Sequence, residues 1–352
     1  MSLHEYKGAL HVHSTYSDGD ASVPEILDAA RESGLDFVVL ADHATLAARR
    51  DGWEGWHGGV LLAVGTELHV GQHHCMAIGL EDLDGFPHET TAGGLESIQR
   101  HGGLTFVVHP HPVHKPFFKV WVPGWTDWDL DTIDGLEIWP YLHDWIRDLR
   151  PWNFLSHVRH PDRWVKGPDA SVLREWDAMG RRRRVVGIGS LDNHARRLPF
   201  RRWRPVLFEV LPHRYAFRTV RTHVLSPEPF SGEAAEDLAR LYSLLARGRC
   251  YVSYDLAGDA TGFRFEAERA GSPASMGDEI AAGAEVSFRV ASPLDAELRL
   301  LRDGQPIAAA RGRALAARAA APGVYRVEAF LNGRPWVYSN PIYVREGVIR
   351  NS

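Results

Sequence analysis

Short apolar strands alternate with amphipathic helices through the first two-thirds of the sequence, and this alternation leaves few possible folds. Residues 8–12 and 36–41 are apolar enough for buried strands. The helix expected between them, residues 22–34, has Ser22 as its N-cap and Gly34 as its stop. A strand, a helix and a strand with short links predict a βαβ unit, and such units build parallel sheets. We therefore expect an α/β fold here.

The alternation continues to about residue 255. Further strands are expected at residues 60–64, 75–80, 104–108, 135–139, 185–190 and 250–254. Further helices are expected at residues 91–101, 144–155, 169–179 and 233–246. We interpret residues 1–257 as one domain.

The composition changes after about residue 258, where short alternating strands replace the helices and no histidine follows His223. These strands are expected at residues 263–268, 285–291, 297–302, 324–331 and 336–344. Asp303-Gly304 and Asn332-Gly333 are hairpin-turn signals. The alanine-rich residues 308–321 could form a helix, but we favour strand and loop. We expect residues 258–352 to form a small antiparallel, Ig-like β-sandwich.

Residue types that bind metals stand at the ends of the expected strands. His11 and His13 are two apart in a strand, so both imidazoles should leave the same face. One such motif is weak evidence in a chain with 19 histidines, and a single histidine is more often a hydrogen-bonded core or surface residue. The whole set is much stronger and predicts a metal site where the strands end: His11, His13, Asp18, His43, Glu67, His74, His109, Asp192 and His194.

The overall composition excludes several classes of protein. The formal charge of −5 and the lack of a basic stripe argue against a dedicated nucleic-acid binder. Cys75 and Cys250 are far apart and are expected to be buried thiols rather than a disulfide. There is no signal-peptide pattern and no run of about 18 apolar residues, so no membrane partner is expected. These features predict a soluble, cytoplasmic protein.

Taken together, the motifs resemble those of the polymerase-and-histidinol-phosphatase (PHP) family of metallohydrolases. The matching pieces are His11-Val12-His13-Ser14, Ser17-Asp18-Gly19, Ala41-Asp42-His43, Gly65-Thr66-Glu67, His73-His74 before residues 75–80, Val108-His109-Pro110 and Gly189-Ser190-Leu191-Asp192-Asn193-His194. The resemblance covers residues 1 to about 255. It implies a distorted (β/α)7 barrel with two or three metal ions at the strand ends. The appended β-sandwich resembles a branch of the family that includes carbamate- and ester-cleaving members.

The resemblance also implies which residues would share an ion. The first ion would be held by His11, His13 and Asp192. The second would be held by His74 and His109, with Glu67 bridging it to the first. The third would be held by Asp18, His43 and His194. His73 remains an alternative to His74, although the spacing to Gly79 favours His74.

Six imidazoles and three carboxylates form a ligand set that suits Zn²⁺, Mn²⁺ or Fe²⁺ better than Ca²⁺ or Mg²⁺. Three divalent ions with these carboxylates and one hydroxide would leave a net charge of roughly +2, which matches a phosphate dianion. We therefore expect a metal-dependent phosphoric ester hydrolase in which a metal-bound hydroxide attacks a small phosphorylated substrate.

The residues that would select the substrate are less clear from the sequence. Arg196 and Arg197 could clamp a second anionic group. They belong to an arginine-rich stretch that could equally be a solvated loop, and the other arginines of this stretch are Arg201, Arg202 and Arg204. His111 and His114 could protonate a leaving group or have a structural role.

Two rival functions remain open. The same metal site could cleave a carbamate, an ester or an amide. Alternatively, the metals could be structural in a binding protein whose β-sandwich recognises a glycan or a partner. A nucleic-acid-processing role is disfavoured by the negative charge, and the oligomeric state is left open.

Overall fold

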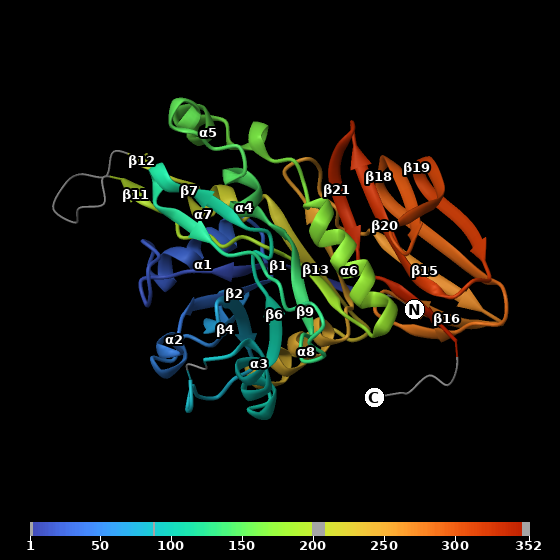
Figure 1. Cartoon of the computed structure of the whole chain (residues 1–352), viewed down its shortest axis with the longest axis horizontal. Helices are drawn as coiled ribbons and strands as arrows, with labels where there is room; N and C mark the ends of the chain where they lie inside the picture. The colour runs from blue at the N-terminus through green and yellow to red at the C-terminus, as the bar shows by residue number, and fades with distance from the viewer. Residues whose placement is uncertain (1–2, 87–88, 199–207, 347–352) are drawn as a thin grey trace.

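The computed structural model describes residues 3–86, 89–198 and 208–346. It is a mixed α/β structure in which helices and strands form one side and an all-β region, residues 264–345, forms the other (Figure 1). Among the described residues, no helix combines the length and the apolar character that crossing a bilayer requires.

The N-terminal strands are parallel at first and then reverse. β1 (His4–Val12) is parallel to β2 (Phe37–His43), and β2 is parallel to β4 (Val60–Val70). β5 (His73–Ile78) is antiparallel both to β4 and to β6 (Leu104–Val107). The parallel arrangement expected throughout is wrong at β5, because only two residues join β4 to β5 and a parallel partner needs a long crossover.

The later strands return to the first one. β9 (Gly135–Pro140) is parallel to β6, and β10 (Val186–Ser190) is parallel to β9. Just after β10, the Leu191 N–H donates to the Leu10 carbonyl at 2.9 Å. The carboxyl ends of β1 and β10 therefore lie next to each other.

A strand that the sequence did not predict joins the two sides of the molecule. β13 (Val220–Ser226) is antiparallel to β1 and to β14 (Cys250–Tyr254). β14 in turn pairs with β21 (Arg334–Ser339) of the all-β region, so the backbone hydrogen bonding continues from one side into the other.

Four predicted helices are confirmed with end shifts of about three residues at most: α1 (Val23–Glu32), α3 (Thr91–Arg100), α6 (Ala170–Arg182) and α8 (Ala234–Ala246). Ser22 precedes α1 as expected, and both its N–H and its hydroxyl donate to the Glu25 carboxylate at 2.8 Å. Because the exposed helix ends are capped in this way, the sequence signals locate them well.

The helix expected at residues 144–155 is wrong. The chain instead forms α4 (Tyr141–Ile146), the 3-10 turn η2 (Pro151–Asn153) and α5 (Phe154–Arg159). Pro151 has no N–H to donate and disfavours helix at the residue before it, so one continuous helix cannot form.

The all-β region is built from β15 (Arg264–Arg269), β16 (Ser272–Ser275), β17 (Glu279–Ala281), β18 (Val286–Arg302), β19 (Gln305–Ala319), β20 (Gly323–Leu331), β21 and β22 (Ile342–Arg345). The alanine-rich stretch lies mostly in β19 and pairs with β18 along its length, so the strand interpretation is confirmed there. Asp303 and Gly304 both have positive φ, 51° and 79°, as a tight hairpin turn requires.

Shorter elements complete the chain: α2 (Ala47–Arg50), β3 (Gly55–His57), β7 (Val113–Lys115), η1 (Pro116–Phe118), β8 (Val120–Val122), η3 (Pro161–Trp164), β11 (Arg197–Leu198), β12 (Phe208–Glu209) and α7 (His213–Ala216). Several of them lie between a strand end and the next long element, where loops that carry function are usually found.

The two sides are fastened by buried polar contacts. The Arg326 guanidinium on β20 donates to both Asp177 oxygens on α6 at 2.8 Å. The Asn340 side chain bonds the main chain of Gly187 in β10. Its Oδ1 accepts from the Gly187 N–H, and its Nδ2 donates to the Gly187 carbonyl, both at 2.8 Å. Such contacts resist separation, because breaking them would leave buried charges and amides without partners. Cys75 and Cys250 are free and buried, as predicted.

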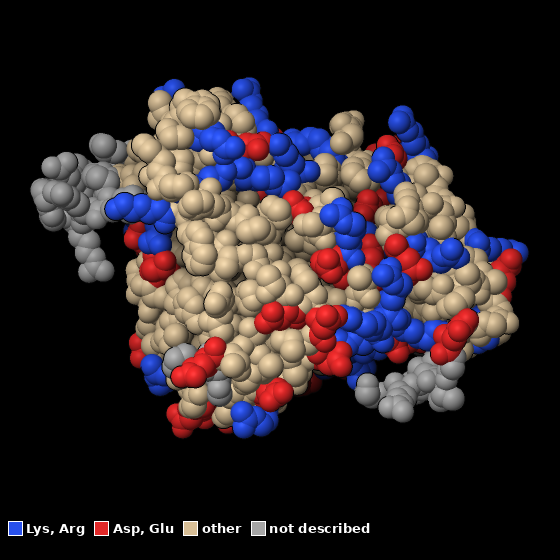
Figure 2. Space-filling view, in the orientation of Figure 1, with Lys and Arg blue, Asp and Glu red and all other residues tan. Residues whose placement is uncertain are grey.

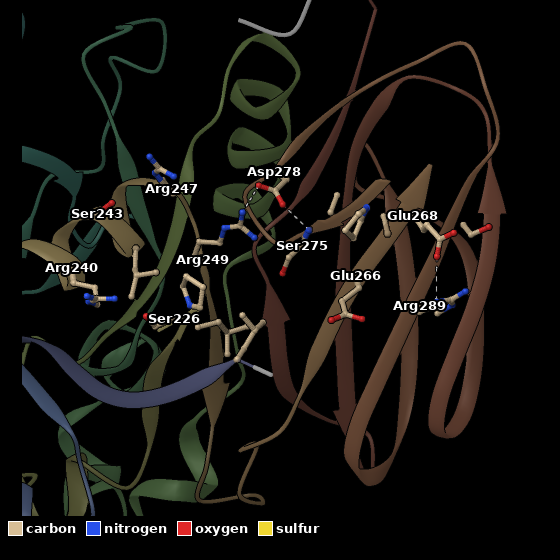
Figure 3. Close-up of a pocket in the computed structure, with 18 of the residues that line it drawn as sticks. Ser226, Arg240, Ser243, Arg247, Arg249, Glu266, Glu268, Ser275, Asp278 and Arg289 are labelled. Carbon is tan, nitrogen blue, oxygen red and sulfur yellow. Dashed lines mark hydrogen bonds and ion pairs between the residues drawn. The ribbon is translucent and has the colours of Figure 1, made fainter. Parts of the chain in front are cut away.

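A cavity of about 570 Å³ lies between α8 and the β15–β16 hairpin (Figure 3). Arg240 and Ser243 of α8 and Arg247, just after it, line one side, and Glu266 and Ser275 line the other. None of the predicted metal ligands lines this cavity. The candidate chemistry therefore lies elsewhere.

Candidate metal centre

Glu67, near the middle of β4, lies at the meeting point of the predicted ligands and is buried. One carboxylate oxygen, Oε2, is 3.2 Å from His11 Nε2 and 3.4 Å from His13 Nε2. The other, Oε1, is 2.6 Å from His74 Nδ1 and 2.9 Å from His109 Nε2. His43 Nδ1, at the end of β2, is also 3.3 Å from Oε2. Five imidazoles from β5 and from the ends of β1, β2 and β6 thus surround one carboxylate.

Asp192, just after β10, makes a second meeting point. Its Oδ1 lies 3.2 Å from His13 Nε2 and 3.6 Å from His11 Nε2. Its Oδ2 lies 3.0 Å from Nε2 of His143, a residue of α4. The adjacency of the β1 and β10 ends brings these groups together.

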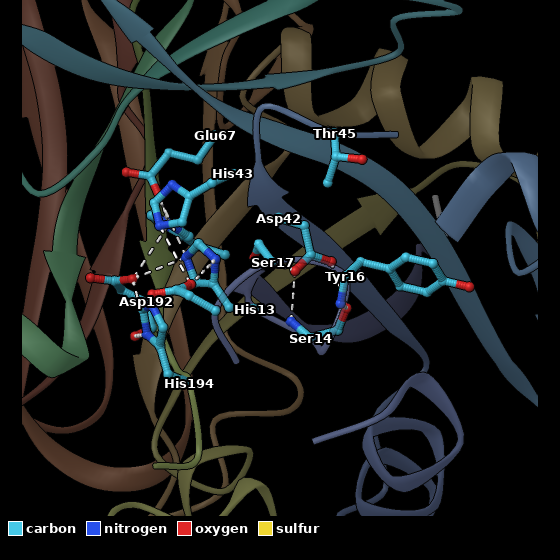
Figure 4. A network of polar contacts seen from close by, with 12 residues as sticks. His13, Ser14, Tyr16, Ser17, Asp42, His43, Thr45, Glu67, Asp192 and His194 are labelled. Carbon is cyan, nitrogen blue, oxygen red and sulfur yellow. Dashed lines mark hydrogen bonds and ion pairs between the residues drawn. The ribbon is translucent and has the colours of Figure 1, made fainter. Parts of the chain in front are cut away.

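Asp18 makes a third meeting point, in the loop after β1. Its Oδ1 is 3.2 Å from His194 Nε2, 3.5 Å from His43 Nε2 and 3.7 Å from His13 Nδ1. Its Oδ2 accepts a hydrogen bond of 2.6 Å from Arg196. His13, His43, Glu67, Asp192 and His194 converge in Figure 4.

The side chains fall into four overlapping groups whose ligand atoms lie within 4.8 Å of one another. The groups are His13, Asp18, His43 and His194; His11, His13, Glu67 and Asp192; Glu67, His74 and His109; and His109, His143 and Asp192. All nine predicted ligands are present, and His143 is the one addition.

The spacing within these groups fits a divalent ion. Donor atoms about 2.0–2.1 Å from a tetrahedral ion would be about 3.3 Å apart. The separations of 3.2–3.6 Å between Nε2 of His11 or His13 and the carboxylates of Glu67 and Asp192 match that edge length. Both ring nitrogens of His13 and Asp18 Oδ1 are buried without a hydrogen-bond partner among the described residues, and such orphaned atoms are expected where a ligand binds.

The backbone is unusual at the same positions. His11, His109 and Asp192 have positive φ values of 61°, 30° and 49°. Residues with a Cβ rarely adopt this conformation, and it concentrates at functional sites. β1 also changes register between Ala9 and Val12, so simple strand alternation does not by itself explain why His11 and His13 converge.

The charges of the centre are strongly coupled. Burial raises the pKa of Glu67 and of Asp192, but the surrounding imidazoles outweigh it, and both pKa values lie well below the ordinary range. Burial lowers the pKa of His13, but Asp192 and Glu67 raise it to about 9. A proton on His13 therefore balances part of the carboxylate charge, and a divalent cation could replace it.

Two buried residues of the centre were missed from the sequence. Glu137, in β9, accepts from His11 Nδ1 at 2.6 Å and from the His109 N–H at 2.6 Å. His143 contacts Asp192, and its ring stacks on His109 with 4.6 Å between centroids. A lone acidic residue in the apolar strand Gly-Leu-Glu-Ile-Trp was the available signal for Glu137, since a buried carboxylate needs partners. His143 had no comparable signal.

A buried carboxylate beside the centre shapes the loop that carries Asp18. Asp42 accepts from the Ser14 N–H at 2.8 Å, from the Ser14 hydroxyl at 2.7 Å and from the Ser17 hydroxyl at 2.5 Å (Figure 4). These bonds hold both ends of the turn, so Asp18 is presented toward His43 and His194.

His73 and Arg197 point away from the centre. His73 Nε2 lies 3.1 Å from the Thr126 hydroxyl, and the structure favours His74 as the group that meets Glu67. The Arg197 guanidinium donates to Glu25 at 2.7 Å, and its part in a substrate clamp stays a prediction.

The other residues predicted to contact the substrate differ in their distance from the candidate metal centre. His111 lines a small hollow with His143, and its Nδ1 lies 3.7 Å from Asp169. Arg196 reaches Asp18 directly. The remaining arginines of the stretch, Arg201, Arg202 and Arg204, lie outside the described residues.

No protein-family model and no curated protein matches the chain. Solved structures do match. One is a two-domain protein from Bacteroides vulgatus containing a predicted PHP-like metal-dependent phosphoesterase, with 15% identity, a TM-score of 0.42 and coverage of 96% of this chain and 95% of that one. The structure of this chain is thus similar to that of a protein described as PHP-like.

Two further structures match in part. A candidate metal-dependent phosphoesterase from Bifidobacterium adolescentis has 14% identity and a TM-score of 0.31, over 58% of this chain and 96% of that one. An amidohydrolase from Chromobacterium violaceum was solved with bound sulfate and no metal. It has 13% identity and a TM-score of 0.34, over 53% of this chain and 87% of that one. These two similarities are distant and cover little more than half of this chain.

Proposed function

We propose that the chain is a metal-dependent hydrolase of small phosphoric esters. The observation that carries the proposal is the position of Glu67, whose Oε1 faces two imidazoles and whose Oε2 faces three, all 2.6–3.4 Å away. A carboxylate placed in this way can bridge two ions, with His11 and His13 on one side and His74 and His109 on the other. His43 and His194 with Asp18 would hold a third.

Divalent ions bound there would supply a Lewis acid and lower the pKa of water. The protein's own residues supply orientation. Glu137 accepts a hydrogen bond from His11 Nδ1, which leaves Nε2 free to bind, and Asp42 holds the turn of Asp18. His111, which lines a small hollow with His143, would be the proton donor to the leaving group.

The charge of the site suits a phosphate dianion. The three ligand carboxylates would leave roughly +2 with three divalent ions and one hydroxide. Glu137 adds one negative charge and Arg196 adds one positive charge, so the two additions cancel. Arg196 lies beside Asp18, where its guanidinium could also reach an anionic substrate group.

The same proposal extends to the architecture. The strand order β1, β2, β4, β5, β6, β9 and β10, with the contact from Leu191 back to Leu10, supports a distorted seven-stranded barrel. Residues 258–352 would be a separate β-sandwich domain. The pairing of its long strands β18 and β19 shifts register, at residues 291–296 of β18 and residues 312–314 of β19. Strands that are shared between two sheets show such irregularities.

Purified protein should contain at least one tightly bound divalent metal per chain and hydrolyse p-nitrophenyl phosphate when loaded with Mn²⁺ or Zn²⁺. His13→Ala should abolish turnover and lower the metal content. His101→Ala is the matched control, because His101 is an exposed residue at the end of α3. Protein that holds no metal and gains no turnover would contradict the proposal.

A panel of aryl esters, carbamates and amides on the same preparation distinguishes the alternative scissile bonds. Faster cleavage of any of these than of phosphate esters would replace the phosphoesterase assignment but keep the hydrolase. Metal binding without turnover on the whole panel would favour the binding-protein alternative.

A further inference from the structure

Exposed apolar side chains are concentrated on three segments that follow strands of the candidate metal centre. Among the described residues, the large hydrophobic side chains that lie exposed are Phe117 (73%), Trp121 (69%), Trp152 (82%), Leu155 (67%), Phe208 (36%) and Ile307 (41%). All except Ile307 belong to these segments. We call residues 116–122, 151–155 and Phe208 the aromatic rim. Apolar surface of this kind usually marks an interaction site.

The rim is continuous across segments far apart in sequence. Ring centroids are 5.1 Å apart for Phe117 and Phe118, 5.7 Å for Phe118 and Phe154, and 6.3 Å for Phe154 and Phe208. Figure 1 shows β7, α5 and β12 along the same edge of the molecule.

The rim is also anchored. Phe118 and Phe154 pack against the main hydrophobic core, and Lys115 Nζ donates to the Arg147 carbonyl at 2.6 Å. The segments that carry the exposed rings of Trp121 and Trp152 are therefore held in place by neighbouring contacts.

The charge around the rim is positive although the whole chain carries −5. Residues 111–122 contain Lys115 and Lys119 and no acidic residue. Residues 147–163 contain four arginines and two acidic residues, Asp148 and Asp162, and Glu209 follows Phe208. Basic residues therefore outnumber acidic ones around the rim. Figure 2 shows blue side chains gathered along this edge. An anionic partner is favoured.

The rim is connected to the centre through the chain. β7 begins four residues after His109, α4 before η2 carries His143, and β12 follows His194 through β11. A partner on the rim would therefore lie beside the loops that hold the ligands.

We propose that the aromatic rim docks the protein onto the surface of an anionic lipid bilayer. Exposed tryptophans flanked by lysine and arginine match the interface between lipid headgroups and acyl chains, where aromatic rings and cations both bind well. Leu155 also fits an apolar phase and offers no ring on which a nucleic-acid base could stack. Docking of this kind needs no membrane-spanning helix, and it does not rest on the hydrolase function.

The test is co-sedimentation of the full chain with vesicles made of equal parts of phosphatidylglycerol and phosphatidylcholine, and with phosphatidylcholine vesicles, while tryptophan fluorescence is recorded. Binding to the anionic vesicles with a blue-shifted emission, weakened by salt, is expected. Trp121→Ala and Trp152→Ala should each weaken binding about ten-fold, and Lys119→Glu should weaken it as well. Ile307→Ala is the matched control and should bind like the wild type.

Three results would overturn the proposal. The first is wild-type protein that does not bind anionic vesicles, or tryptophan variants that bind as tightly as the control. The second is tighter binding to a single-stranded oligonucleotide, lost in the same variants, which would assign the rim to nucleic acid. The third is a wild-type dimer that Trp152→Ala dissociates, which would assign the rim to self-association. Circular dichroism of each variant verifies that it is folded.

Discussion

Glu137 Oε1 lies 2.6 Å from Nδ1 of His11, so a carboxylate of β9 orients an imidazole of β1. Both side chains are fully buried. The other oxygen of Glu137 accepts the His109 N–H, so one residue supports two of the proposed ligands. A carboxylate behind a metal-binding histidine fixes its tautomer and increases its basicity.

Glu137→Gln should therefore weaken metal binding about 10–100-fold while the chain remains folded. Competition with a chelator measures the affinity, and circular dichroism measures the fold. Glu285→Gln, at an exposed carboxylate, should leave the affinity unchanged. Wild-type affinity in Glu137→Gln would show that His11 does not depend on this hydrogen bond.

Metal binding should release protons and should strengthen as the pH rises toward 9. The pKa of His13 is about 9 without metal, so this imidazole is protonated at pH 7 and must lose its proton before it can bind. Calorimetric titrations of Zn²⁺ in buffers with different ionisation enthalpies count the protons released. An affinity that does not change between pH 6 and pH 9 would exclude this exchange.

Asp42→Asn should loosen the turn that carries Asp18. The Ser14 and Ser17 hydroxyls donate to the Asp42 carboxylate, and the NH₂ group of an asparagine could not accept one of these hydrogen bonds. The lost bond should lower the free energy of unfolding by about 1–3 kcal/mol. Denaturant titration measures the loss, which should exceed that of Ser17→Ala. Equal losses in the two variants would contradict the role assigned to the Asp42 carboxylate.

Arg326→Ala should destabilise the contact between the two sides of the molecule. It would leave Asp177 as an uncompensated buried charge, which typically costs about 3–5 kcal/mol. The exposed pair Arg318–Glu285 is the control, and Arg318→Ala should cost less than about 1 kcal/mol. Denaturation followed by near-ultraviolet circular dichroism tests both, and similar losses would show that burial of the Arg326 pair does not matter.

Local patterns in the sequence were enough to predict much of the fold and the proposed ligand set. Capping at Ser22 and the hairpin turn at Asp303-Gly304 depend on neighbouring residues, and the structure has both. Eight of the nine ligand-type residues stand at or near strand ends, where residues of one chain can meet, and Glu67 lies within β4.

Other features depended on residues distant in sequence and were settled only by the tertiary structure. β13 pairs with β1, more than 200 residues earlier, and with β14, about 30 residues later. Arg197 binds Glu25 rather than a residue of the candidate metal centre. Glu137 gains its partners only when β9 lies beside the ends of β1 and β6. Local propensity and spacing determine which residues can bind a metal, whereas long-range pairing and burial determine which second residue supports each of them.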